Sequence, residues 1–288
     1  MKTVTKEFVE KLIDFAPSLE QSGMGYAETQ IEGTAALFNM LVRNRCAYLA
    51  DEVGMGKTYV ALGVMSLFRY FNPHAKIMVI APRENIQRKW IKELENFVRF
   101  NWKSVGNRIK SIQGRPAWEP VYCNSLFDFV HEVLLDSNRD FFLRMPSFSF
   151  RLKNPESQKK IKTEICRHIR WVDRHSLKVS EKNYQGFRDS FGGILNAVIP
   201  EIDLLVVDEA HKLKHGFGKN VSTRNRIMGL AFGHPTGHEM EFEWFKKKAK
   251  HVLFLSATPF EEEYSAIQRQ FDIFGFGNAE FQTPDGHD

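Results

Sequence analysis

Short apolar runs along the chain alternate with longer segments in which apolar residues recur every three or four positions. The short runs are not interrupted by polar residues, which is typical of strands buried on both faces of a parallel sheet. Strands are predicted at five of them: Arg45–Ala50, Lys76–Ala81, Pro120–Asn124, Asp203–Val207 and His251–Ser256. The segments 57–71 and 84–100 have the spacing of helices with one buried face. This alternation predicts an α/β fold in which helices flank a parallel β-sheet.

Two long segments do not follow this alternation, and we expect both to be helical insertions that project from the sheet. The first, at about 126–200, is basic and helical in pattern, and it ends in GFRDSFGG, which we expect to be flexible. The second, at about 215–250, ends in WFKKKAK, for which we expect a basic helix. We predict a helical lead-in at 1–28, one main unit at 29–275, and a tail or the start of a linker at 276–288.

Composition and charge are those of an ordinary globular protein. Of the 288 residues, 43% are hydrophobic and 26% charged, and 40 basic residues against 35 acidic ones give a formal net charge of +5. No apolar run approaches the roughly 20 residues of a membrane-spanning helix, and Lys and Glu interrupt the N-terminal MKTVTKEFVEKLIDF, unlike a secretory signal peptide. The three cysteines form no CxxC pair, so neither a disulfide framework nor a zinc site is indicated. We expect a soluble intracellular protein that has no membrane partner.

Basic residues are concentrated in one stretch, Arg151–Lys178. It holds nine Lys and Arg residues, and its acids are Glu156, Glu164 and Asp173. Such a stretch is either the solvated face of a helix or a surface that contacts phosphates, and composition alone does not separate the two.

The first group of residues with recognisable chemistry is AYLADEVGMGKT, in which a predicted strand runs into a glycine-containing turn and then a helix. Glycines let backbone N–H groups converge on an anion, the helix N-terminus adds partial positive charge, and a lysine reaches the β- and γ-phosphates of a nucleotide. The threonine hydroxyl is suitably placed to ligate Mg²⁺. A strict phosphate loop would have glycine where Asp51 stands. The candidate nucleotide-binding residues here are Gly54, Met55, Gly56, Lys57 and Thr58.

The second group is IDLLVVDEAHKLK, in which Asp208 and Glu209 follow a predicted strand. Ligands of open α/β sheets bind at the carboxyl ends of the strands. Asp208 can hold Mg²⁺ there, and Glu209 can orient or deprotonate an attacking water. The alternative is a plain strand exit or helix cap. A third stretch, SATP at 256–259, follows the last predicted strand and would by itself indicate a turn before a helix.

Taken together and in this order, the three groups resemble the motifs of superfamily 2 helicases and translocases. The resemblance implies a RecA-like lobe, that is, a P-loop NTPase with a parallel β-sheet flanked by helices and with helical insertions. LADEVGMGKT is similar to motif I of the Swi/Snf-type members, whose loop begins with Asp-Glu, so Asp51 fits this family. DEAHKLK resembles their motif II, a DEAH box, and SATP resembles their motif III.

Weaker matches imply further binding residues. TQIEG resembles the stretch upstream of motif I, which implies that Gln30 contacts the adenine edge; the alternative is an exposed residue at a helix start. VIAPRENIQRKWIKE resembles motif Ia, and this implies nucleic-acid backbone contacts for Pro82 and Arg83. A motif Ib match around VYCNSLFDF implies another such contact for Ser125.

Other matches concern packing and coupling. Trp90 and Glu93 match the W-x-x-E of the same family, and we expect Trp90 to pack in the core rather than stack on a base. The resemblance implies that His211, Ser256 and Thr258 couple the nucleotide site to the DNA-facing side and the partner lobe. A structural role is the alternative for His211.

The resemblance covers about 30–274 and corresponds to the first lobe of a two-lobed motor. It implies an ATP- and Mg²⁺-binding lobe of a double-stranded DNA translocase, whose hydrolysis needs a second RecA-like lobe in the same or another chain. The insertions are possible sites for protein partners. Such a protein would be cytoplasmic and nucleoid-associated in a bacterium, or nuclear in a eukaryote. The alternatives are a strand-separating or RNA-directed helicase of the same superfamily, and a nucleotide-gated DNA-binding scaffold.

Overall fold

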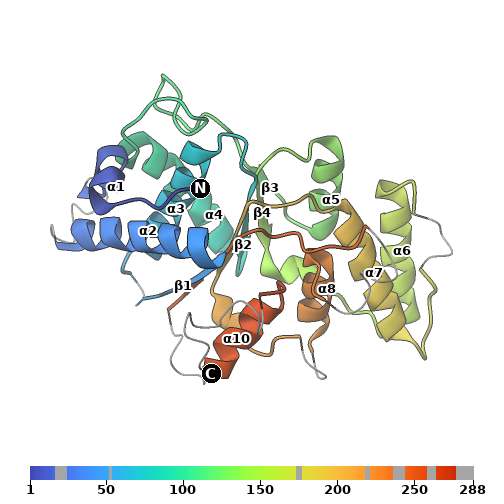
Figure 1. The fold of residues 1–288 in the computed structure, drawn as a ribbon. Coiled ribbons are helices and arrows are strands. Elements are labelled where there is room, and N and C mark those ends of the chain that lie inside the picture. Colours follow the sequence, from blue (N-terminus) through green and yellow to red (C-terminus); the bar gives the residue numbers. More distant parts are fainter. Residues whose placement is uncertain are drawn as a thin grey trace.

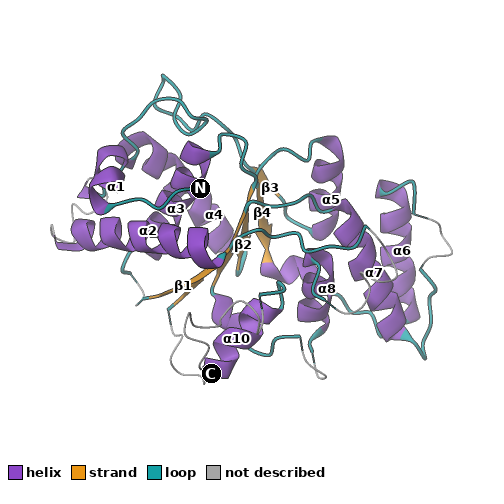
Figure 2. Ribbon diagram, viewed as in Figure 1, coloured by secondary structure: helices purple, strands orange, loops and turns teal. Residues whose placement is uncertain are grey.

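The structure is a computed structural model that describes residues 1–16, 25–51, 54–172, 177–217, 221–235, 244–257 and 264–276. At its centre lies a six-stranded sheet of strand order β1-β6-β5-β2-β4-β3 (Figure 2), and the strand pairs are all parallel. The predicted parallel α/β fold is therefore confirmed. The strands are β1 (Cys46–Ala50), β2 (Ile77–Ala81), β3 (Val121–Tyr122), β4 (Phe141–Arg144), β5 (Leu204–Asp208) and β6 (Val252–Ser256).

Helices cover both faces of this sheet (Figure 1). One face carries α1 (Lys6–Leu12), α2 (Gly25–Asn44), α3 (Lys57–Phe71) and α4 (Glu84–Asn96), which continues as a π-helical turn over Phe97–Asn101. The other carries α5 (Leu126–Leu135), α6 (Pro155–His168), α7 (Tyr184–Val198), α8 (Thr223–Phe232), α10 (Tyr264–Asp272) and the 3₁₀ turns Met145–Phe148 and Ala210–Leu213.

Because helices cover both faces of the sheet, the strands are uninterrupted apolar runs in the sequence. Along β2, Ile77 and Val79 pack into the core beneath α1–α4, whereas Met78 and Ile80 pack into the core on the opposite face. Neighbouring side chains of a strand point to opposite faces, so a strand covered on both sides has no polar position.

Strand β4 was not predicted, and it lies inside the segment 126–200 that we expected to project as a helical insertion. It pairs with β2 on one side and β3 on the other, so this part of the segment belongs to the sheet. The strand is only four residues long and ends in Arg144, which makes its apolar run too short to stand out.

The expected flexibility of GFRDSFGG is wrong, because these residues lie within helix α7. A Cβ atom added at Gly192 would lie 2.6 Å from Cβ of Leu230 in α8. Glycine at this position therefore serves the close approach of two helices.

The expected helix at WFKKKAK is also wrong. The segment 244–250 is not helical: Ala249 forms a parallel bridge with Ile202, and the Lys250 N–H donates to the Ile202 carbonyl at 2.9 Å. Lys248 is only 5% exposed, so the lysine run does not form a solvated helix face.

Within the described ranges, no helix is both long and apolar enough to cross a membrane. Cys46 and Cys123 are buried, and Cys166 is partly exposed.

Candidate nucleotide-binding site

A cavity of about 560 Å³ lies at the carboxyl ends of β1 and β5. This cavity is distinguished by the residues that line it. Another cavity of similar volume, about 580 Å³, lies between α4 and residues 114–122 and is lined by none of the predicted site residues. Eight residues that the sequence nominated line the 560 Å³ cavity together: Gln30, Gly54, Met55, Gly56, Lys57, Thr58, Asp208 and Glu209. Segments far apart in the chain thus meet where α/β proteins bind their ligands.

The loop before α3 needs glycine for two separate reasons. Gly54 and Gly56 have φ values of +94° and +78°, in the left-handed region that favours glycine. A Cβ atom at Gly56 would also lie 2.0 Å from Nε2 of Gln30. Lys57 begins α3 beside the cavity, and its Nζ donates to the Asp51 carbonyl at 2.7 Å.

Gln30 is buried, with 5% of its surface exposed, and lies in the second turn of α2 rather than at a helix start. Its Nε2 donates to the Met55 carbonyl at 3.4 Å, while its Oε1 is buried and has no hydrogen-bond partner among the described residues. A buried acceptor without a partner is costly unless a ligand satisfies it. This favours the predicted binding role over the exposed alternative.

Tyr26 lines the same cavity and was missed by the sequence analysis. It lies four residues before Gln30 in α2, so the two side chains are neighbours on the helix surface. The i, i+4 spacing would have indicated Tyr26 if the helix had been predicted to begin before Gln30.

The two acids after β5 differ in their surroundings. Asp208 accepts hydrogen bonds from the Trp90 indole Nε1–H and from the Glu209 backbone N–H, both at 2.9 Å. Burial raises the pKa of Asp208, and the negative charge of Glu209 raises that pKa further. Glu209 has a left-handed backbone with φ +53°. A half-buried carboxylate beside a second one is a favourable place for a divalent cation.

Helix α4 brings a third carboxylate to the cavity. Glu93 lines it, and burial raises the pKa of Glu93 against the opposing effect of the Lys89 charge. The Lys89 Nζ lies 3.3 Å from Glu93 Oε1. Trp90 is buried in the core as expected, and its polar N–H also holds Asp208. Helical periodicity predicts the burial of such a ring but does not reveal the partner of its N–H.

His211 lies between the acidic pair and the end of β6. Its Nδ1 is 3.2 Å from Glu209 Oε2 and 3.0 Å from the hydroxyl of Ser256, which is fully buried. The side chain therefore links the Asp-Glu segment to the strand that carries SATP. Thr258, the other residue expected to couple the sites, lies outside the described residues.

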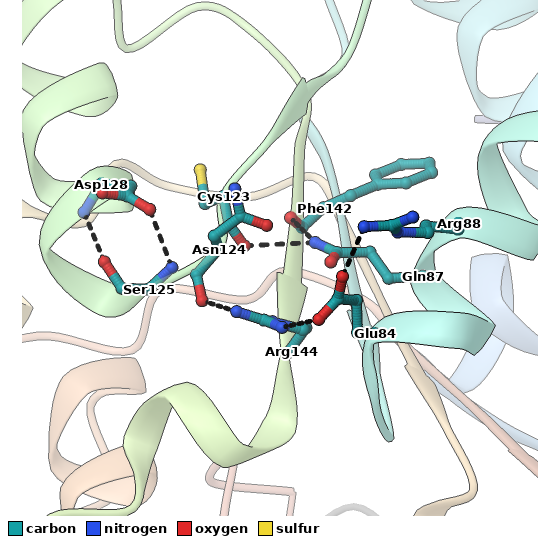
Figure 3. Close-up of polar contacts among 9 residues, drawn as sticks. All are labelled: Glu84, Gln87, Arg88, Cys123, Asn124, Ser125, Asp128, Phe142 and Arg144. Atoms are coloured by element: carbon teal, nitrogen blue, oxygen red, sulfur yellow. Dashed lines mark hydrogen bonds and ion pairs between the residues drawn. The ribbon is translucent and has the colours of Figure 1, made fainter.

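The predicted nucleic-acid contacts lie apart from the nucleotide cavity. Arg83 and Ser125 line a second cavity of about 490 Å³ after the ends of β2, β3 and β4, whereas Pro82 is buried and does not line it. Ser125 caps α5: its hydroxyl accepts from the Asp128 N–H at 3.1 Å, and Asp128 Oδ2 accepts from the Ser125 N–H at 3.0 Å (Figure 3).

Arg144, at the end of β4, also lines this second cavity. Its Nη1 donates to Glu84 Oε2 at 3.0 Å, and its Nη2 donates to the Asn124 carbonyl (Figure 3). Sequence analysis missed this residue because it missed β4.

A parallel sheet with a glycine-rich loop after β1 and an Asp-Glu pair at the end of β5, with β6 between these strands, is a RecA-like P-loop fold. The family model "Type III restriction enzyme, res subunit" matches residues 23–261. The chain belongs to this family, which confirms the predicted relation to superfamily 2 helicases.

Among the solved structures to which the chain is similar is the Sulfolobus solfataricus SWI2/SNF2 ATPase core in complex with dsDNA, with 16% identity over 87% of this chain and a TM-score of 0.46. Another is the Sulfolobus solfataricus SWI2/SNF2 ATPase core domain, with 16% identity over 89% of this chain and a TM-score of 0.47. The Pyrococcus furiosus Hef helicase domain is also similar, with 11% identity over 83% of this chain and a TM-score of 0.39. The chain spans 35% of each of these solved chains. No curated protein sequence matches it.

Proposed function

We propose that this chain is the ATP-binding lobe of a Swi/Snf-type translocase that moves on double-stranded DNA. The observation that carries the proposal is the meeting of Lys57 and Thr58 with Asp208 and Glu209 around one cavity. A cationic loop at a helix N-terminus binds phosphates, and a carboxylate and a hydroxyl at its side bind Mg²⁺.

The residues present fit ATP with Mg²⁺. Lys57 and the loop amides would hold the phosphates, Thr58 and Asp208 would hold Mg²⁺, and Glu209 would orient the attacking water. The unpartnered Oε1 of Gln30 supplies an acceptor for the amino group of adenine. Mg²⁺ would neutralise charge that develops on the phosphates.

The contact between His211 and Ser256 supports a coupling role for this pair. The His211 imidazole contacts both Glu209 and Ser256, the last residue of β6. A movement of Glu209 on nucleotide binding or hydrolysis would therefore be transmitted to the SATP segment. In the proposed motor this segment, with Thr258, would connect ATP hydrolysis to the DNA-facing side and the partner lobe.

These 288 residues alone are expected to bind ATP·Mg²⁺ but to hydrolyse it slowly, because a second RecA-like lobe would supply an arginine finger. Arginine fingers contribute about 10³–10⁵ in rate in related phosphoryl-transfer systems. The test measures ATP binding and turnover with and without duplex DNA, alongside Glu209→Gln as the chemistry-deficient control.

Rapid turnover stimulated by DNA in the 288-residue chain would contradict the need for a second lobe. If ATP binds but single-stranded RNA stimulates turnover better than duplex DNA, an RNA-directed helicase replaces the translocase. If no nucleotide binds even when a second lobe is supplied, a scaffold replaces both.

The basic segment is proposed to add contacts to the duplex backbone. In α6, Ile161 and Ile165 are buried while Lys159 and Lys160 are exposed, so the helix presents its charge outward. Lys162 differs, because its Nζ donates to the Leu177 carbonyl at 2.8 Å and so helps to hold the following loop.

Reversing the exposed charges with Lys159→Glu and Lys160→Glu is therefore expected to weaken duplex binding and to flatten its salt dependence. The slope of log Kobs against log salt should fall by about 0.9 for each phosphate that the variant no longer neutralises. The matched control is Lys2→Glu with Lys11→Glu, which reverses two exposed lysines in or near α1, on the other side of the sheet (Figure 1). Equal slopes in both double variants would return α6 to the solvated-face interpretation.

A further inference from the structure

Helix α4 carries a row of four polar or hydrogen-bonding side chains at intervals of three residues: Glu84, Gln87, Trp90 and Glu93. Residues three apart are neighbours on a helix surface, so the row is continuous and winds around α4. The rise per residue of an α-helix places its two ends about 14 Å apart along the axis. Glu84, Gln87 and Trp90 contact groups outside α4, and the two ends of the row, Glu84 and Glu93, line different cavities.

The first half of the row is tied to the strand ends beside the 490 Å³ cavity (Figure 3). Glu84 accepts from Arg144, which also donates to the carbonyl of Asn124, the residue before Ser125. Gln87 is 3% exposed, and its Nε2 donates to the carbonyls of Cys123 at 3.2 Å and Phe142 at 2.8 Å. The start of α4 is thus fixed to the segments that follow β3 and β4.

The second half of the row is tied to the nucleotide cavity. Trp90 donates to Asp208, and Glu93 lines the cavity together with Thr58. Asp208 and Thr58 are the two residues that would hold Mg²⁺. Trp90 is 1% exposed and Gln87 is 3% exposed. Water therefore does not compete with the hydrogen bond from Trp90 to Asp208 or with those from Gln87 to the backbone carbonyls.

We propose that α4 couples the nucleotide cavity to the second, nucleic-acid-facing cavity, with Arg144 and Trp90 as the positioning residues at its two connections. A hydrogen-bonded helix moves as a unit, so a shift of Asp208 on nucleotide binding is transmitted through Trp90 and displaces Arg83, Asn124 and Ser125 together. This inference rests on the proposed function. The route is distinct from the contact between His211 and Ser256, which runs through the ends of β5 and β6.

The test compares the dissociation constant of ADP·Mg²⁺ with and without a saturating short DNA duplex. The ratio of the two constants is the coupling factor, which typically lies at about 5–150 in coupled systems. We expect a factor above about 5 in the wild-type chain and a fall toward about 1 in Arg144→Gln and in Trp90→Phe. Arg88→Gln is the matched control, because Arg88 is exposed and donates to the same Glu84 carboxylate from within α4; it should keep the wild-type factor.

A second measurement does not depend on nucleic acid. ADP·Mg²⁺ alone should slow amide hydrogen exchange at residues 124–126 in the wild-type chain, and this protection should be lost in Arg144→Gln. If Arg144→Gln fails to fold, the wild-type exchange decides: protection supports the coupling, and unchanged exchange overturns it.

The outcomes separate this inference from the proposed function. Wild-type binding of both ligands with a factor that Arg144→Gln and Trp90→Phe leave unchanged would overturn the inference alone. Loss of the factor in Arg88→Gln as well would also overturn it, because charge near Glu84 rather than the link through α4 would then be responsible. Failure to bind nucleotide or duplex even when a second lobe is supplied would overturn the proposed function, and the inference with it.

Discussion

Replacement of Lys57 by alanine is expected to weaken the binding of ATP·Mg²⁺ by about 10- to 100-fold. The change removes a charge-assisted hydrogen bond to phosphate, and such bonds contribute about 1.5–3 kcal/mol. Lys57 lies at the start of α3 and lines the cavity that also holds Asp208, so no neighbouring lysine of α3 can replace it. The measurement is a titration with a fluorescent ATP analogue in the presence of Mg²⁺, repeated with EDTA.

Lys92→Ala provides the control for this titration. It removes the same charge from an exposed position on α4 that does not line the cavity, and its affinity for nucleotide should equal that of the wild-type chain. Equal affinities of Lys57→Ala and Lys92→Ala for ATP·Mg²⁺ would show that nucleotide does not bind at the loop before α3.

Replacement of Asp140 by alanine is expected to lower the free energy of unfolding by about 3–5 kcal/mol, because it leaves a buried charge without its partner. Asp140 and Arg69 form an ion pair whose side chains are 2% and 5% exposed. Asp140 Oδ1 also accepts from the Ile77 N–H at 2.8 Å, so one carboxylate connects α3, β2 and the residue before β4.

Urea unfolding would measure this loss, and pH 8 is the appropriate condition. Burial raises the pKa of Asp140 to about 6 against the opposing charge of Arg69, so the carboxylate is ionised at pH 8. Arg139→Ala is the control: its ion pair with Glu132 is 39% and 30% exposed, and such pairs contribute about 0–1 kcal/mol. A loss below about 1 kcal/mol in Asp140→Ala, the range of exposed pairs, would contradict the importance of the buried pair.

Four of the five predicted strands agree closely with the structure, whereas the fifth, at 120–124, forms only the two-residue edge strand β3. β1, β2, β5 and β6 agree with the prediction to within about one residue, because a change from apolar to polar side chains marks each end. β4 has the same environment but only four residues, and its final position is Arg144. The short apolar run of β4 is therefore the reason that this strand was not predicted. Because β4 was not predicted, Arg144 at its end was not recognised as a candidate site residue.

The candidate site was predicted where a motif fixed both the residue type and its spacing. Lys57 and Thr58 begin the helix after the loop that follows β1, and Asp208 and Glu209 lie at the end of β5. The four residues lie together because the carboxyl ends of parallel strands share one edge. The W-x-x-E match singles out Glu93 but does not place it in the cavity, since that depends on how α4 packs across the sheet. Packing between helices is set by many side chains at once, and one sequence does not reveal it.

The pairing of β1 has a consequence for the order in which the protein assembles during synthesis. β1 lies at the edge of the sheet, and its one strand partner is β6, with Cys46 opposite Val252 and Ala50 opposite Ser256. β1, which leads into the phosphate loop, can therefore pair only after β6 (Val252–Ser256) has been synthesised. Such long-range pairing forms slowly and leaves an unpaired edge open to aggregation until it forms. A nascent chain released before Val252 would lack β6 and α10, so β1 could not join the sheet and the nucleotide site would not form.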